Sequence, residues 1–62
     1  MSQQFTAAQI RDMIERCVNE GRNITAWEKD FLTSISEQMD RIGRLSPKQI
    51  EILERIYVEK VP

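Results

Sequence analysis

The chain has 62 residues, with nine Lys or Arg against ten Asp or Glu, and this length allows one domain at most. The near-neutral charge excludes a protein that coats nucleic acid through a large basic excess. One cysteine and no histidine exclude an intrachain disulfide and argue against a structural zinc site. We therefore treat residues 1–62 as a single small domain, whose marginal stability must come from packing or self-association.

After a polar lead-in at residues 1–5, the first expected helix covers residues 7–20. Thr6 and Gln9 have the spacing of a capping box, in which each side chain bonds the other residue's backbone N–H. Gly21 is predicted to end the helix in a left-handed conformation. The apolar stripe consists of Ile10, Met13, Ile14, Cys17 and Val18.

The second expected helix covers residues 26–42 and begins at a second capping box, formed by Thr25 and Glu28. Glu37 and Arg41 are spaced as an i, i+4 ion pair on the polar side, and Gly43 ends the helix. The apolar stripe consists of Trp27, Phe31, Leu32, Ile35, Met39 and Ile42.

The third expected helix covers residues 47–60. Ser46 and Gln49 form a third capping box, and Pro47 occupies the first helical position, where no backbone N–H is needed. Leu45 and Ile50 are spaced as a hydrophobic staple. The apolar positions cover about half the circumference, which is wider than two neighbouring helices require: Ile50, Ile52, Leu53, Ile56, Tyr57 and Val61. Three stripes facing one core predict an all-α fold, a compact three-helix bundle.

The sequence offers no catalytic, metal-binding or cofactor-binding constellation. Glu28 is accounted for by its cap, Cys17 lies within an apolar stripe where a cysteine behaves as a small hydrophobe, and both glycines are expected at helix ends. We expect neither an enzyme nor a small-molecule substrate. The longest apolar run is three residues and the N-terminus lacks a signal-peptide pattern, so we expect no membrane association and a cytoplasmic location.

Basic residues gather at the turn between the second and third helices, namely Arg41, Arg44 and Lys48. Cations beside a helix N-terminus suit an anion or phosphate, which makes weak nucleic-acid binding an alternative function. The simpler interpretation is that Arg41 pairs with Glu37, Arg44 pairs with Asp40, and Lys48 is solvated.

Partner binding is predicted from surplus apolar surface. Trp27 lies at the edge of its stripe in the first turn of its helix, where we expect part of its ring to be exposed. Tryptophan is over-represented among interface hot spots. Ile52 and Ile56 add apolar width to the third helix beyond the expected internal need. The alternative is that Trp27 covers the end of the bundle and the third helix is its central element.

Two resemblances extend this interpretation. The segment Leu45-Ser46-Pro47-Lys48-Gln49-Ile50-Glu51-Ile52-Leu53-Glu54-Arg55-Ile56 resembles the opening helix of LuxR-type and sigma-factor helix-turn-helix domains. In those domains the DNA-reading helix comes next, and residues 57–62 are too few to form it. The resemblance therefore covers the scaffold part alone.

The second resemblance covers residues 25–57. The pattern T-A-W-E-x-x-F-L-x-S-I, followed by R-L-S-P-K-Q-x-x-I-L-E-R-I-Y, is similar to a helical segment of phage and bacterial DNA replication and recombination proteins. The matching positions are Trp27, Glu28, Phe31, Ile35, Leu45, Ser46, Lys48, Gln49, Leu53 and Ile56. The resemblance implies a mobile-element protein connected with nucleic-acid machinery and implies no chemistry. Together with a complete core, complete caps and no site chemistry, it leads us to expect a small non-catalytic helical interaction protein from a phage or bacterium, which binds a protein of nucleic-acid metabolism or a second copy of itself.

Overall fold

A computed structural model describes residues 5–62 of the chain. The polar lead-in expected at residues 1–5 lies outside this range apart from Phe5, which packs against the core. Within the described residues the secondary structure consists of three α-helices: α1 (Ala7–Glu20), α2 (Ala26–Ile42) and α3 (Pro47–Lys60). The fold is all-α, and the predicted bounds of the three helices are confirmed.

Each helix begins at the capping box that its sequence predicts. At α2, the Glu28 N–H donates to Thr25 Oγ1 at 3.1 Å, and the Thr25 N–H donates to Glu28 Oε1 at 2.9 Å. The same reciprocal pair joins Thr6 with Gln9 at α1 and Ser46 with Gln49 at α3. These bonds satisfy N–H groups that a helix start would otherwise leave unpaired. The starts are therefore fixed locally.

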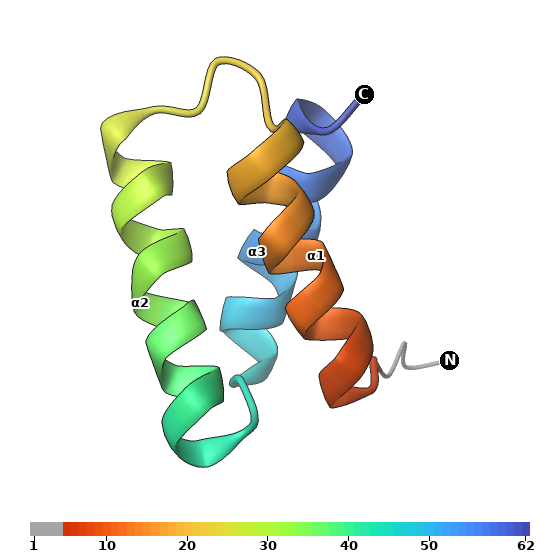
Figure 1. Ribbon diagram of the computed structural model, residues 1–62, viewed down its shortest axis with the longest axis vertical. Coiled ribbons are helices and arrows are strands. Elements are labelled where there is room, and N and C mark those ends of the chain that lie inside the picture. The colour runs from red at the N-terminus through yellow and green to blue at the C-terminus, as the bar shows by residue number, and fades with distance from the viewer. Residues whose placement is uncertain (1–4) are drawn as a thin grey trace.

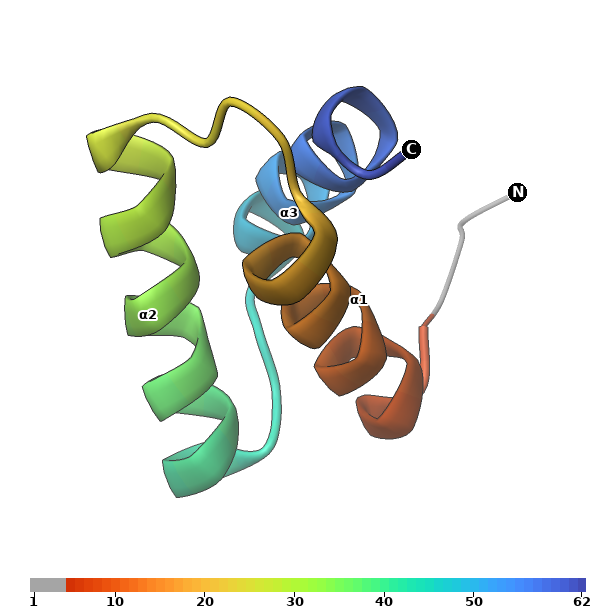
Figure 2. The same cartoon turned by 45° about the horizontal axis from the view of Figure 1, so that its top comes forward.

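The helices alternate in direction along the chain (Figure 1). α1 and α3 run the same way and lie side by side, while α2 runs back in the opposite direction. Figure 2 shows α2 standing to one side of this pair, joined to α1 by the connector 21–25 and to α3 by the turn 43–46. The C-terminal end of α3 consequently lies next to the connector between α1 and α2.

The core lies where the three helices face one another. α1 makes more extensive contact with both neighbours than α2 makes with α3. Leu32, Ile35 and Leu53 are almost completely shielded from solvent, and Leu45 packs with them from the turn before α3. The buried set is Ile10, Met13, Ile14, Cys17, Leu32, Ile35, Met39, Leu45, Leu53 and Ile56.

Three residues of the predicted stripes are exposed and lie outside this core, namely Val18, Trp27 and Ile42. Val18 is 63 % exposed and Ile42 is 64 % exposed, although helical spacing places both beside buried residues. Each lies close to the end of its helix, where the neighbouring helix no longer covers the edge of the stripe. The helical period fixes which face is apolar, and the positions of the neighbours decide how much of that face is buried.

The end of α1 differs from the prediction for Gly21. This glycine has φ −65°, so it is not left-handed, and the positive φ of the connector falls on Asn23 at 58°. Glycine is required at 21 for space, because an added Cβ would lie 2.4 Å from Cys17 O and 2.8 Å from Ile24 Cδ1. At the end of α2, by contrast, Gly43 is left-handed with φ 74°, as predicted.

Candidate functional site

The first turns of α2 carry an exposed aromatic pair. The rings of Trp27 and Phe31 are 5.5 Å apart between centroids and 5° from parallel, so they stack. Trp27 is 61 % exposed, whereas Phe31 is partly buried and packs against the core. Phe31 therefore supports the Trp27 ring while most of Trp27 stays exposed. The prediction that part of the Trp27 ring is exposed is confirmed.

The other two predicted partner-binding residues lie on α3 and differ from each other. Ile56 is only 3 % exposed and belongs to the core, so its prediction as a surface residue is wrong. α3 packs against both α1 and α2, and its buried residues Leu53 and Ile56 take up part of the apolar width that is predicted to be surplus. Ile52 is partly buried and packs against the core, which leaves part of its side chain at the surface.

Helical spacing gathers the apolar surface residues of α2 on one side. Taking about 100° per residue, Trp27, Phe31, Gln38 and Ile42 lie within about 60° of one another around the helix. This side faces α3, because Gln38 exchanges two side-chain hydrogen bonds with Gln49 of α3.

We call this surface the α2–α3 face. It consists of Trp27, Phe31 and Ile42 on α2, with Ile52 on α3. Ile52 follows Gln49 by three residues and so shares its side of α3.

The basic cluster at the turn between α2 and α3 is fully at the surface. Arg41, Arg44 and Lys48 are all exposed, and within residues 5–62 no ion pair joins any of them to an acidic side chain. The expected pairs of Arg41 with Glu37 and of Arg44 with Asp40 are therefore not formed.

Asp40 is engaged from α1 instead. Arg11 Nη1 lies 2.9 Å from Asp40 Oδ1, and Arg11 Nη2 donates to the Met39 carbonyl at 3.1 Å. The guanidinium thus binds a carboxylate and a backbone carbonyl in the last turn of α2, where the helix dipole favours a cation. Arg44 is left without its predicted partner.

A shallow hollow lies at the same turn. It has a volume of about 380 Å³ and is lined by Gln38, Ile42, Arg44, Leu45, Ser46 and Pro47. Its lining combines aliphatic side chains with the arginine and with the capping serine of α3. The hollow was not predicted, since it depends on how the turn folds back between the two helices.

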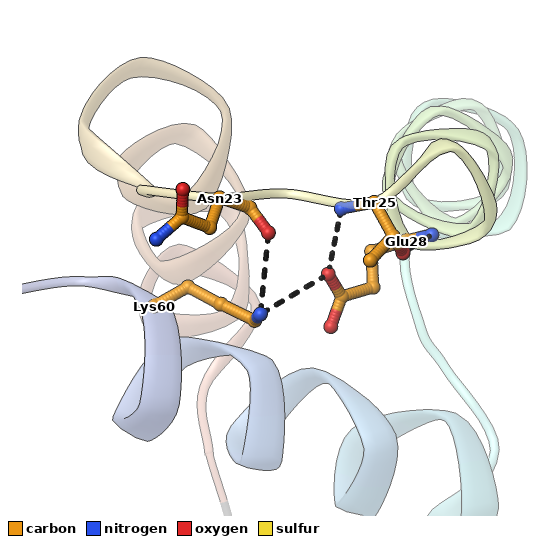
Figure 3. A network of polar contacts seen from close by, with 4 residues as sticks. All are labelled: Asn23, Thr25, Glu28 and Lys60. Carbon is orange, nitrogen blue, oxygen red and sulfur yellow. Dashed lines mark hydrogen bonds and ion pairs between the residues drawn. The ribbon is translucent and has the colours of Figure 1, made fainter.

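A polar network closes the opposite end of the molecule (Figure 3). Lys60 Nζ donates to the Asn23 carbonyl at 3.2 Å and lies 3.8 Å from Glu28 Oε1, while the Lys60 carbonyl accepts the Arg22 N–H at 2.9 Å. The pKa of Glu28 lies below its ordinary value. The largest cause is the hydrogen bond that the carboxylate accepts from the Thr25 N–H, and the nearby charge of Lys60 acts in the same direction, while burial opposes them. These contacts give Glu28 a structural role beyond its cap.

Cys17 lies in the core, away from the candidate sites. Cys17 is completely buried, and burial together with the charge of Glu28 raises the pKa of its thiol to about 11, so the thiol stays protonated near neutral pH. The prediction that Cys17 belongs to the core is confirmed. Within residues 5–62, no three His, Cys, Asp or Glu side chains lie close enough together to hold a metal ion.

No protein-family model matches this chain, and no match was found among curated proteins or solved structures. None of the described helices is long and apolar enough to span a membrane. The fold itself defines an all-α protein of three helices, and its candidate functional features are the α2–α3 face and the basic cluster.

Proposed function

We propose that this chain is a small non-catalytic helical interaction protein of phage or bacterial origin. Its partner is a protein of nucleic-acid metabolism or a second copy of the chain, and Trp27 lies at the centre of the contact. The observation that carries the proposal is the stacked pair of Trp27 and Phe31, with Trp27 61 % exposed.

The energetics of an exposed tryptophan support this function. When a Trp side chain acts as an interface hot spot, its truncation to alanine weakens binding by about 2 kcal/mol or more. Stacking on Phe31 orders the Trp27 ring before any partner arrives, which lowers the entropic cost of binding. Single exposed aliphatic residues such as Val58, 71 % exposed, are common and need no explanation. Trp27 differs because its exposed ring adjoins a second aromatic ring.

The proposed origin and process rest on the resemblance of residues 25–57 to segments of phage and bacterial replication and recombination proteins. The matching positions divide between core residues such as Ile35 and Leu53, capping residues such as Ser46, and the exposed Trp27 and Lys48. Core and capping residues account for a shared fold. Trp27 is the exposed apolar position among them, and a shared protein interaction would use it.

Site-specific photo-crosslinking in a bacterial lysate tests this function. Trp27→p-benzoylphenylalanine should give a discrete adduct with one protein or with a second copy of the chain. Val58→p-benzoylphenylalanine is the matched control, because Val58 is similarly exposed and lies outside the α2–α3 face.

Sedimentation equilibrium at high micromolar concentration separates self-association from binding to another protein. Self-association through the α2–α3 face should be lost in Trp27→Ser and kept in Val58→Ser. A strict monomer that also yields no adduct specific to position 27 contradicts the proposal.

Direct nucleic-acid binding is a second candidate, favoured by the absence of ion pairs at Arg41, Arg44 and Lys48. Three phosphate contacts predict micromolar affinity that falls about forty-fold between 50 and 200 mM salt. Gel shifts at low salt with single-stranded and double-stranded DNA and RNA test it. Absence of any shift excludes this candidate.

A further inference from the structure

Three cations without ion-pair partners are concentrated within one turn and its two flanking helix ends. Arg41 lies in the last turn of α2, Arg44 in the turn itself, and Lys48 in the first turn of α3. Asp40, which the sequence predicts as the partner of Arg44, is bound instead by Arg11 of α1 at 2.9 Å. The fold thereby preserves a local positive charge on a chain whose net charge is −1.

Apolar surface lies directly beside these cations. Ile42 is 64 % exposed and lines the hollow of about 380 Å³ together with Leu45 and Pro47. Arg44 lines the same hollow, so one cation and three aliphatic residues border a single concavity. A ligand that fits this surface needs an apolar group for the hollow and negative charge for its rim.

We propose that this surface binds a short acidic peptide segment whose apolar side chain enters the hollow. The surface, which we call the turn surface, consists of Arg41, Ile42, Arg44 and Lys48 with the lining of the hollow. This inference rests on the proposed function as an interaction protein and adds the chemistry of the partner. Carboxylates of the segment pair with the three cations, and the dipole at the start of α3 adds to the positive potential.

Charge complementarity favours a peptide over a nucleic acid. A nucleic acid gains affinity from each phosphate that it neutralises, and three cations give it few contacts. Glu37 and Glu51 are exposed on the helices that flank the turn, so the positive region is short and repels a long polyanion at both sides. A peptide with two or three carboxylates matches this extent.

The shape and lining of the hollow also favour a peptide over a nucleic acid. Bases of single-stranded nucleic acids bind by stacking on aromatic rings. The hollow is lined by aliphatic and polar side chains, and the exposed Trp27 lies at the other end of α2. An aliphatic or aromatic peptide side chain can fill such a hollow without a stacking partner.

Selection from a random library of 12-residue peptides, using the intact chain as bait, tests the proposal. Peptides that combine Asp or Glu with a large apolar residue should be enriched. A fluorescein-labelled synthetic copy of the most enriched peptide then measures affinity by fluorescence polarisation. Arg44→Glu should weaken binding at least tenfold, as should Lys48→Glu, because each reverses a charge that faces a carboxylate.

Two further variants test the apolar contact in the hollow and the effect of a charge reversal outside the turn surface. Ile42→Ser should weaken binding severalfold without unfolding the chain, because Ile42 is mostly exposed. Arg22→Glu is the matched charge control, since Arg22 lies in the connector at the opposite end of the molecule, and its affinity should equal that of the wild type. Circular dichroism verifies that each variant is folded.

The outcomes distinguish this inference from the proposed function. Enrichment of peptides that lack acidic residues overturns the inference about the turn surface. The same holds if the enriched peptides lose affinity in Trp27→Ser and keep it in Arg44→Glu. Neither result contradicts binding at the α2–α3 face. Binding of a 20-nucleotide DNA through Arg44 and Lys48, with no acidic peptide enriched, overturns the inference in favour of nucleic acid. No enrichment at all overturns the inference, while photo-crosslinking at position 27 still tests the proposed function separately.

Discussion

The side-chain amides of Gln38 and Gln49 bind each other reciprocally, with both N–H···O distances at 2.9 Å. Gln49 is also the capping-box residue of α3, whose Oε1 accepts the Ser46 N–H at 2.8 Å. Gln38 Nε2 in addition donates to the Arg44 carbonyl at 3.2 Å. One amide pair thus connects the start of α3 to the middle of α2 and to the turn between them.

We therefore expect Gln38 and Gln49 to be energetically coupled. Gln49→Ala should lower the free energy of unfolding by about 1–2 kcal/mol, since it removes a cap and the amide pair. Gln38→Ala should cost about 1 kcal/mol. The loss of unfolding free energy in the double variant should be smaller than the sum of the two single losses by about 0.5–1 kcal/mol, as measured by urea denaturation. Costs that add fully would show that the amide pair contributes nothing to stability.

The coupling of Gln38 with Gln49 also marks the limit of what the sequence predicts. All three helix starts follow from capping boxes, whose partners are three residues apart and so need no knowledge of the fold. The partner of Gln38 is eleven residues away and across a turn. Helical spacing places Gln38 on the apolar side of α2, but neither periodicity nor capping identifies Gln49 as its partner.

For the candidate sites too, sequence spacing predicts features within one helix and misses contacts between residues that are far apart in the chain. Trp27 was predicted from its place at the edge of a stripe, and its exposure is confirmed. Ile56 is buried against the prediction, because sequence spacing does not show how much of the wide apolar stripe of α3 its two neighbours cover. Arg44 was assigned Asp40 as a partner by proximity along the chain, but Arg11, 29 residues away, takes that carboxylate.

Gly21 and Gly43 should respond differently to the same substitutions. At Gly43 the obstacle is a left-handed φ of 74°, so Gly43→Ala should cost about 1 kcal/mol and Gly43→Asn less, because Asn tolerates this conformation. At Gly21 the obstacle is contact with Cys17 O and the Ile24 side chain. Gly21→Ala should cost about 1–3 kcal/mol, and Gly21→Asn at least as much.

Thermal denaturation of the four glycine variants measures these differences. The informative comparison is which residue, Ala or Asn, gives the higher melting temperature at each position. If Asn were the better residue at 21 as well, the steric explanation for Gly21 would be wrong and a conformational one would replace it.

Glu28 should contribute to the pH dependence of stability. Because its pKa in the folded chain is lower than in the unfolded chain, the ionised carboxylate stabilises the fold above the unfolded pKa. This stabilisation is lost as the pH falls through the folded pKa, below about pH 4.3. Glu28→Gln keeps a capping-box residue, as Gln9 and Gln49 do in this chain, and removes the titrating group.

The free energy of unfolding, measured from pH 7 down to pH 2, should therefore fall less steeply for Glu28→Gln than for the wild type. Glu51→Gln serves as the control, since Glu51 is exposed and has no ion pair with the described residues. An unchanged acid profile in Glu28→Gln would mean that the Thr25 and Lys60 contacts do not favour the ionised form.

Cys17 should be almost inert to thiol reagents while the chain is folded. With a pKa of about 11, only about a thousandth of the thiol is ionised at pH 8, against about a quarter for an unperturbed cysteine. The side chain is also inaccessible to solvent, so reaction requires opening of the core. Iodoacetamide should react at least about a hundredfold more slowly with the folded chain than with the chain in urea.

A variant with a single exposed cysteine shows how fast iodoacetamide reacts with an accessible thiol in this chain. Val58→Cys combined with Cys17→Ala places the thiol at a position that is 71 % exposed in the wild type, and it should react at the rate of a free thiol. Since the reaction of Cys17 requires opening of the core, substitutions that weaken the core, such as Leu53→Ala, should accelerate it about tenfold for each ~1.4 kcal/mol of stability that they remove. Fast labelling of folded Cys17, unaffected by such substitutions, would contradict its place in a closed core.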